Sequence, residues 1–229
     1  MSSVKNKEFK VEIAAKILFK RKCNYLIETI TEITSQFVKN EQDIEEEHWT
    51  KTGDATDLSS EDFEYHSKYL EELLEKHKHL PQILYKSIIV SIYSLLETAI
   101  NDIIKCVEYE VPKKIKFKHL RTKGSEIENF INFLELVHNL DFETIKPCLN
   151  KLKPFADLRN NIVHKNGNLK YDNDQRVKNI MTLASQNSSM EIIDEEVFFK
   201  NNLILFQYLK IVESFGYKFF DLVKITNTQ

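Results

Sequence analysis

The chain of 229 residues is long enough to bury one sizeable hydrophobic core, and its 42% hydrophobic and 29% charged residues are ordinary for a soluble globular protein. Four glycines and four prolines are too few for a β-sandwich or β-barrel with many tight turns, so the composition excludes those folds and favours long helices. The net charge of −3 excludes a global basic field, although residues 1–80 carry −5 and residues 81–229 carry +2, so a polyanionic partner is expected to meet the second part.

The first part of the chain predicts two helices. Apolar residues recur at helical intervals through residues 8–48, and a segment rich in Gly, Asp, Ser and Thr then interrupts the pattern. Ser59 or Ser60 is expected to cap a second helix, which should stop before Pro81 because proline disfavours helix at the residue before it. The two helices predict an antiparallel hairpin.

Residues 82–111 are apolar on nearly every side, as expected for a helix in the centre of a bundle. One narrow polar stripe interrupts this surface; it consists of Ser87, Ser91, Ser94, Thr98, Asn101 and Lys105. Its small side chains would let another helix or a second subunit approach closely. We therefore divide the chain into an N-terminal helical extension, residues 1–80, and a helical bundle, residues 81–229.

The rest of the chain predicts further helices and one short extended piece. The expected helices cover residues 125–140, 142–165 with a kink or restart at Pro154, 174–186 and 200–225, and the extended piece lies within 188–199. The pair Asn166-Gly167 is expected to end the second of these helices. The sequence thus predicts an all-α fold.

The cysteines and the N-terminus predict a cytoplasmic protein. Cys23, Cys106 and Cys148 are widely spaced and odd in number, which argues against a disulfide framework. The N-terminus lacks the apolar stretch of a signal peptide, and the longest uncharged apolar run, residues 87–96, is too short to span a bilayer. We expect no association with a membrane.

The sequence predicts neither a metal site nor a cofactor. Three histidines, His66, His77 and His79, lie in one predicted helix, and the first two share a face. No cysteine or second carboxylate completes a ligand set around them.

The segment of residues 154–167 carries the residues most suited to chemistry. Asn160 and His164 share its polar face, while Arg159 lies at the edge of the apolar face, roughly 140° from His164. One helix therefore does not direct Arg159 and His164 at one point. Two such helices meeting across a two-fold axis would, because each Arg159 could reach the other subunit's His164.

These residue types suit RNA cleavage without a metal. A histidine can take the proton from a ribose 2′-hydroxyl and return one to the leaving 5′-oxygen. An arginine can bind the phosphate oxygens where negative charge builds, and Asn160 could orient the histidine or donate to the phosphate. The products would be a 2′,3′-cyclic phosphate and a 5′-hydroxyl.

The run from Arg159 and Asn160 to His164 resembles the signature of the HEPN family, an Arg, a polar residue and a His after a short spacing. The stretch Tyr-Ser-Leu-Leu-Glu, residues 93–97 here, also resembles a stretch that many members carry upstream of the motif. The resemblance covers residues 81–225 and implies a HEPN-type helical bundle, with the N-terminal hairpin as an extension. In one subgroup a Tyr follows the His by two positions, where this chain has Asn166.

The resemblance implies a homodimeric endoribonuclease that acts as a toxin or effector in prokaryotic antiviral defence, abortive infection or toxin–antitoxin systems, with an antitoxin or defence-system protein as partner. Glu97 would orient Arg159 or His164, or form an ion pair at the interface. The alternative implied by other members is a non-catalytic HEPN module that binds RNA, a nucleotide or a protein. A third hypothesis is a structural helical adaptor.

Basic residues outside this segment are candidates for RNA binding. They are Lys113, Lys114, Lys116, Lys118, Arg121, Lys123 and, at the end of the motif helix, Lys165. Phe117 and His119 lie among them and could stack on bases. A plain charged loop and a solvated helix end are the alternative interpretations.

Overall fold

The computed structural model describes residues 2–52, 59–110, 114–120 and 125–226. Its elements in chain order are α1 (Ser2–Thr52), α2 (Ser60–Glu110), the 3₁₀ turn η1 (Phe117–His119), α3 (Glu126–His138), the 3₁₀ turn η2 (Glu143–Ile145), α4 (Lys146–Lys165), α5 (Asp174–Ser185), β1 (Met190–Ile193), β2 (Glu196–Phe199) and α6 (Leu203–Thr226). The predominantly helical class predicted from the sequence is confirmed, with one small hairpin added.

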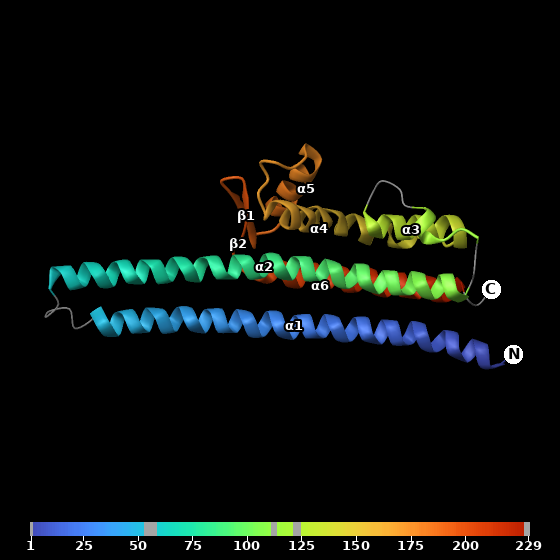
Figure 1. Ribbon diagram of the computed structural model, residues 1–229, viewed down its shortest axis with the longest axis horizontal. Helices are drawn as coiled ribbons and strands as arrows, with labels where there is room; N and C mark the ends of the chain where they lie inside the picture. Colours follow the sequence, from blue (N-terminus) through green and yellow to red (C-terminus); the bar gives the residue numbers. More distant parts are fainter. Residues whose placement is uncertain (1, 53–58, 111–113, 121–124, 227–229) are drawn as a thin grey trace.

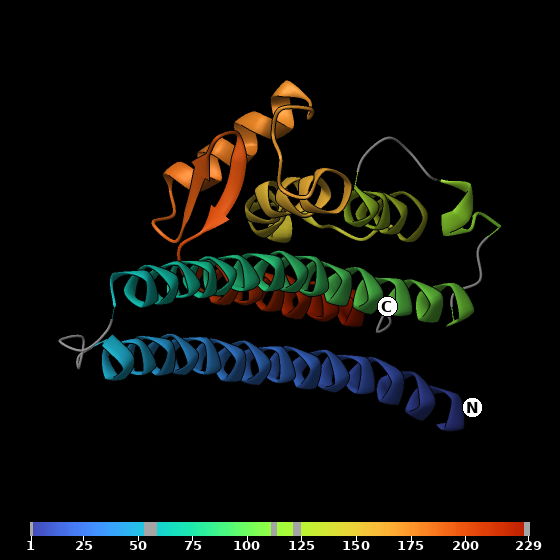
Figure 2. The same cartoon turned by 60° about the vertical axis from the view of Figure 1, so that its left-hand side comes forward.

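The helices are arranged in layers around α2. Helices α1 and α2 run antiparallel beside each other, and α6 lies along α2 as well (Figure 1). Helices α3 and α4 lie on the side of α2 opposite α1, and α5 and the β-hairpin pack at one end of α4 (Figure 2). Helix α2 therefore touches α1, α3, α4 and α6.

Helices α2 and α6 contribute more buried side chains to the core than any other elements. The fully buried side chains there include Ile89, Ile92, Leu96, Ile100, Ile204, Leu205, Tyr208, Val212, Phe215 and Phe219. One stretch of α2 is apolar enough, by length and composition, to cross a membrane. The core helix of a soluble protein passes the same test, and the apolar side of α2 packs on its neighbouring helices.

Two prolines lie inside helices, and the predicted helix end before Pro81 is wrong. Helix α2 continues through Pro81, and α4 continues through Pro154 without a restart. A proline removes one helical hydrogen bond, but packing on both sides can outweigh that loss. The helix of the predicted extension thus runs on into the predicted bundle, and the division at residue 80 stays a prediction.

The other predicted boundaries described below agree with the structure. The hydroxyl of Ser59 accepts a hydrogen bond from the backbone N–H of Asp62 at 3.2 Å, as an N-cap does. Asn166 ends α4 with a left-handed φ of 54°, which asparagine tolerates. The extended piece within residues 188–199 is an antiparallel hairpin, joined by Asp194 and Glu195 at positive φ, as in a type I′ turn.

Packing of α1 on α6 can be tested at Gly216. A Cβ added there would lie 2.6 Å from the ring of Phe19, which is 1% exposed. We expect Gly216→Ala to lower the free energy of unfolding by about 1–3 kcal/mol through this clash. Urea unfolding beside Ser214→Ala, an exposed position on the same helix, checks it. Equal stability of the two variants would show that α1 is not held in this position.

Candidate functional site

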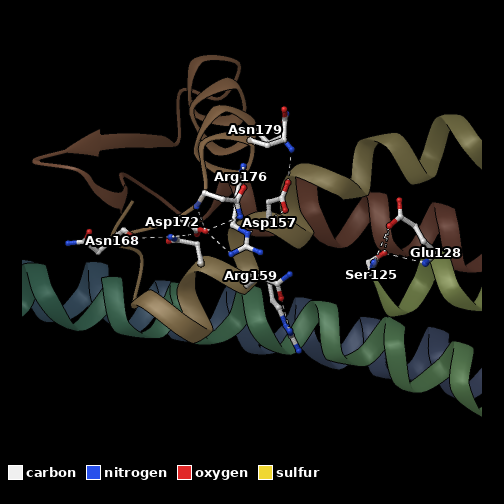
Figure 3. A network of polar contacts seen from close by, with 12 residues as sticks. Ser125, Glu128, Asp157, Arg159, Asn168, Asp172, Arg176 and Asn179 are labelled. Carbon is white, nitrogen blue, oxygen red and sulfur yellow. Dashed lines mark hydrogen bonds and ion pairs between the residues drawn. The ribbon is translucent and has the colours of Figure 1, made fainter. Parts of the chain in front are cut away.

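The guanidinium of Arg159 lies between α4 and α2. It sits over the ring of Tyr93, 5.3 Å from the centroid, and one Nη lies 3.4 Å from a carboxylate oxygen of Glu97. The other Nη donates to the side-chain oxygen of Asn160 at 2.9 Å. Figure 3 shows Arg159 projecting from α4 toward α2. Its side chain is 23% exposed, so the group is held by contacts yet remains within reach of a ligand.

The surroundings of this arginine are polar and partly unsatisfied. Burial raises the pKa of Glu97, and the nearby Arg159 only partly opposes this. The buried Nε of Arg159 and the hydroxyl of Tyr208 have no hydrogen-bond partner. Tyr208 stacks on Phe155 with ring centroids 4.2 Å apart. Sequence reasoning missed Tyr208, because a core aromatic on a distant helix gives no local signal of its contacts.

His164 lies on a different side of α4. Its side chain is exposed, in the last turn before Asn166. The ammonium group of Lys86 on α2 donates to the backbone carbonyl of Asn166 at 2.8 Å and so ties this end of α4 to α2. The structure therefore brings Glu97, Asn160 and Arg159 together and leaves His164 apart from them.

A polar network fixes the C-terminal half of α4. The amide of Asn161, which is fully buried, donates to the carbonyl of Asn168 at 2.8 Å and to Asp172 at 2.9 Å. Asp172 accepts from Arg176 at 2.7 Å, and Arg176 also pairs with Asp157 on α4 (Figure 3). Sequence reasoning missed this network. Asn161 lies inside the motif, but its burial and its partners across a loop have no signal in the sequence.

Acid should weaken this network. Burial raises the pKa of Asp172, but donors from Asn161, Asn173 and Arg176 outweigh it and lower the pKa below its ordinary 3.8. A lowered folded-state pKa contributes stability above pH 3.8, which is lost as pH falls through the folded-state value. We expect Asp172→Asn to cost about 1–3 kcal/mol of stability at neutral pH.

The difference in the free energy of unfolding between wild type and Asp172→Asn should shrink as the pH falls below 3.8. Urea unfolding at pH 7 and at about pH 3 measures it. Asp174→Asn, an exposed acid at the start of α5, is the control. A difference that stays constant with pH would contradict the assignment.

Six of the seven predicted basic residues follow α2 in the chain, whereas Lys165 lies beside His164 at the end of α4. Of the seven, Lys113, Arg121 and Lys123 are outside the described residues. The ammonium of Lys116 donates to the carbonyl of Glu108 at 3.3 Å, and Glu108 follows Glu97 by eleven residues, about 16 Å along a helix. Lys114, Lys118 and Lys165 are exposed. In a single chain the segment around Lys116 is thus separate from His164, which lies near Lys86 in the middle of α2.

The stacking role suggested for Phe117 stays a prediction, and the half-buried ring already has packing partners. Its ring packs on Phe130 and Phe133 of α3, with centroid distances of 4.4 and 5.7 Å. The neighbouring His119 accepts a hydrogen bond from the backbone of Lys116 at 3.2 Å, and its side chain is exposed. Phe117 therefore anchors the basic segment to α3.

Among the described residues, no group of three or more His, Cys, Asp or Glu side chains is placed to hold a metal ion. His66, His77 and His79 do not form such a group.

A scan against protein-family models found no match, and searches of curated proteins and of solved structures found no match either.

Proposed function

We propose that the chain is a metal-independent endoribonuclease of HEPN type, with a composite site shared between two copies. The observation that carries the proposal is the division of the motif between two sides of α4. Arg159 and Asn160 form one cluster with Glu97, whereas His164 is exposed elsewhere on the same helix. A second copy that faces α4 would supply the missing partner to each cluster.

In the proposed reaction His164 of one subunit takes the proton of the ribose 2′-hydroxyl. The 2′-oxygen attacks the phosphorus, and the bond to the 5′-oxygen breaks, which leaves a 2′,3′-cyclic phosphate. The leaving 5′-oxygen receives its proton from the same histidine, which the first step has protonated. Arg159 from the facing copy binds the phosphate oxygens as charge develops on them.

The contacts of Arg159 suit this role. Tyr93 and Glu97 hold the guanidinium from α2, and Asn160 holds it from α4, so its direction is set before a phosphate arrives. We assign Glu97 and Asn160 as positioning residues for Arg159. The phosphate would compete with Glu97, whose raised pKa weakens its hold on the guanidinium as the pH falls.

The polar stripe of α2 supports the position proposed for the second copy. Ser87, Ser91 and Thr98 are exposed there, and their hydroxyls donate to their own helix, which leaves no unpaired donor to bury. Ile83, one helical turn before Ser87 on α2, is an apolar side chain that is 64% exposed. Small residues next to an exposed apolar one suit a close helix contact between two copies.

The biological role follows only from the resemblance. We propose a cytoplasmic toxin or effector of prokaryotic antiviral defence or toxin–antitoxin systems, restrained or triggered by a partner protein. The second candidate is a non-catalytic HEPN module that binds RNA, a nucleotide or a protein. The ion pair of Arg159 with Glu97 favours that candidate, because a structural arginine would be held in the same way.

Cleavage of total RNA and tRNA by the purified chain in excess EDTA tests the proposal. We expect cleavage that survives EDTA and leaves 2′,3′-cyclic phosphate ends. Arg159→Ala should lower the rate by about 10²–10³-fold, and Lys151→Ala, an exposed change on the same helix, should not. Wild-type protein that is folded, dimeric and inert on both substrates would favour the binding module.

A further inference from the structure

A cavity of about 440 Å³ lies between the α1–α2 hairpin and the segment that joins β2 to α6. The larger part of its wall is apolar and includes Phe37, Val38, Leu74, Pro81, Tyr85 and Phe198. The volume falls in the range of small-molecule sites. The described lining is separate from the cluster around Arg159.

The walls of the cavity are tied together. The buried side chain of Gln82 donates to the carbonyl of Phe199 and accepts from its N–H, both at 2.8 Å. Asn202 donates to the hydroxyl of Thr34 on α1 at 3.0 Å. Three separate elements are therefore fixed around the cavity without a ligand, which favours a preformed site.

His77 brings an unsatisfied polar atom to this apolar wall. Its Nε2 atom is buried and has no hydrogen-bond partner among the described residues, and its ring meets Phe37 edge-on with centroids 6.1 Å apart. A buried polar atom without a partner costs stability unless water or a ligand satisfies it. A ligand with a hydrogen-bonding head group and an apolar body would therefore match both parts of the lining.

The charged residues of the lining favour a head group with a single negative charge. Lys78 and Lys200 carry positive charges and Glu41 carries a negative one, so the described lining has one positive charge in excess. Lys200 also pairs with Glu191 at 2.6 Å, which weakens the attraction for a doubly charged group such as a phosphate. A carboxylate has one negative charge and two accepting oxygens, so it can accept from His77 and from a lysine together.

We propose that this cavity binds a monocarboxylic acid with an apolar body, either a fatty acid of medium length or a short acid that carries an aromatic ring. The apolar body packs against the aromatic and aliphatic walls. The carboxylate accepts from His77 and lies toward Lys78 and Lys200. The site is separate from the proposed ribonuclease site, and the proposal stands whether or not RNA is cleaved.

Isothermal titration of the full chain with octanoate, 3-phenylpropionate, acetate and octylamine tests the proposal. Octanoate carries the apolar body as a chain and 3-phenylpropionate carries it as a ring. We expect at least one of the two to bind about tenfold or more tightly than acetate, which lacks the body, and than octylamine, whose charge is opposite. Saturable binding of neither acid would overturn the proposal. A smaller preference over acetate or over octylamine would also overturn it, because the body or the carboxylate would then not be recognised.

Paired variants locate the binding. His77→Leu should weaken binding of the tighter acid by about tenfold or more, whereas His79→Leu, a change of an exposed histidine on the same helix, should not. Lys200→Met should weaken binding of the acid but not of octylamine, with Lys178→Met on α5 as its control. Thermal unfolding of each variant confirms the fold, and Lys78→Met, at an exposed lining residue, is the second variant if His77→Leu does not fold. An affinity for the acid that neither His77→Leu nor the two lining-lysine variants change would place the site elsewhere and overturn the proposal.

Discussion

His164→Ala should reduce RNA cleavage by about 10²–10⁴-fold, because it removes the group proposed to move the proton. Its exposure predicts little loss of stability. Initial rates on a defined tRNA measure the loss of activity, and thermal unfolding measures the stability.

Two control variants distinguish the loss of proton transfer from a general loss of structure. Lys151→Ala changes an exposed side chain on the same helix and should leave the rate unchanged. His164→Gln keeps a hydrogen-bonding side chain, but its amide cannot take a proton from the 2′-hydroxyl, so it should be as inactive as His164→Ala. Activity in His164→Gln close to that of wild type would rule out proton transfer by this residue.

Ser91→Arg should separate the proposed dimer and abolish cleavage. Ser91 is exposed at the middle of the α2 stripe, and an arginine would keep a facing helix from approaching. Overpacking costs about 1–3 kcal/mol, which is roughly a tenfold to hundredfold weaker dissociation constant. Light scattering over a concentration series measures the mass, and cleavage is measured on the same samples.

Ser35→Arg is the matched control, because Ser35 is also an exposed helical serine whose hydroxyl donates to its own helix. It should leave mass and cleavage unchanged. A Ser91→Arg protein that remains dimeric and active would move the interface away from the stripe. One that is monomeric but fully active would contradict the shared site.

Helix positions could be predicted from the sequence because local patterns determine them. The caps at Ser59 and Ser125 and the end of α4 at Asn166 follow from side-chain and backbone preferences of single residues. The end predicted at Pro81 was wrong because packing of α1 and β2 on α2 outweighs one missing hydrogen bond. Such contacts between distant segments are not visible in a local pattern.

The candidate site also divides into features set by local sequence and features set by contacts between distant segments. The separation of Arg159 from His164 follows from helical periodicity alone, and the exposed His164 and half-buried Arg159 agree with it. The sequence left open whether Glu97 pairs with Arg159 or with His164, and the contact between α2 and α4 places it beside Arg159. The burial of the Tyr208 hydroxyl and the hydrogen bonds of Asn161 depend on tertiary packing, so local sequence patterns could not predict them.

Mixed dimers test the central claim, a site shared between two copies, most directly. Arg159→Ala and His164→Ala chains carrying different tags would be co-expressed, and dimers holding one of each purified through both tags. If Arg159 of one copy works with His164 of the other, the mixed dimer contains one complete pair and cleaves RNA in EDTA well above either parent. A mixed dimer as inactive as both parents would contradict the shared site.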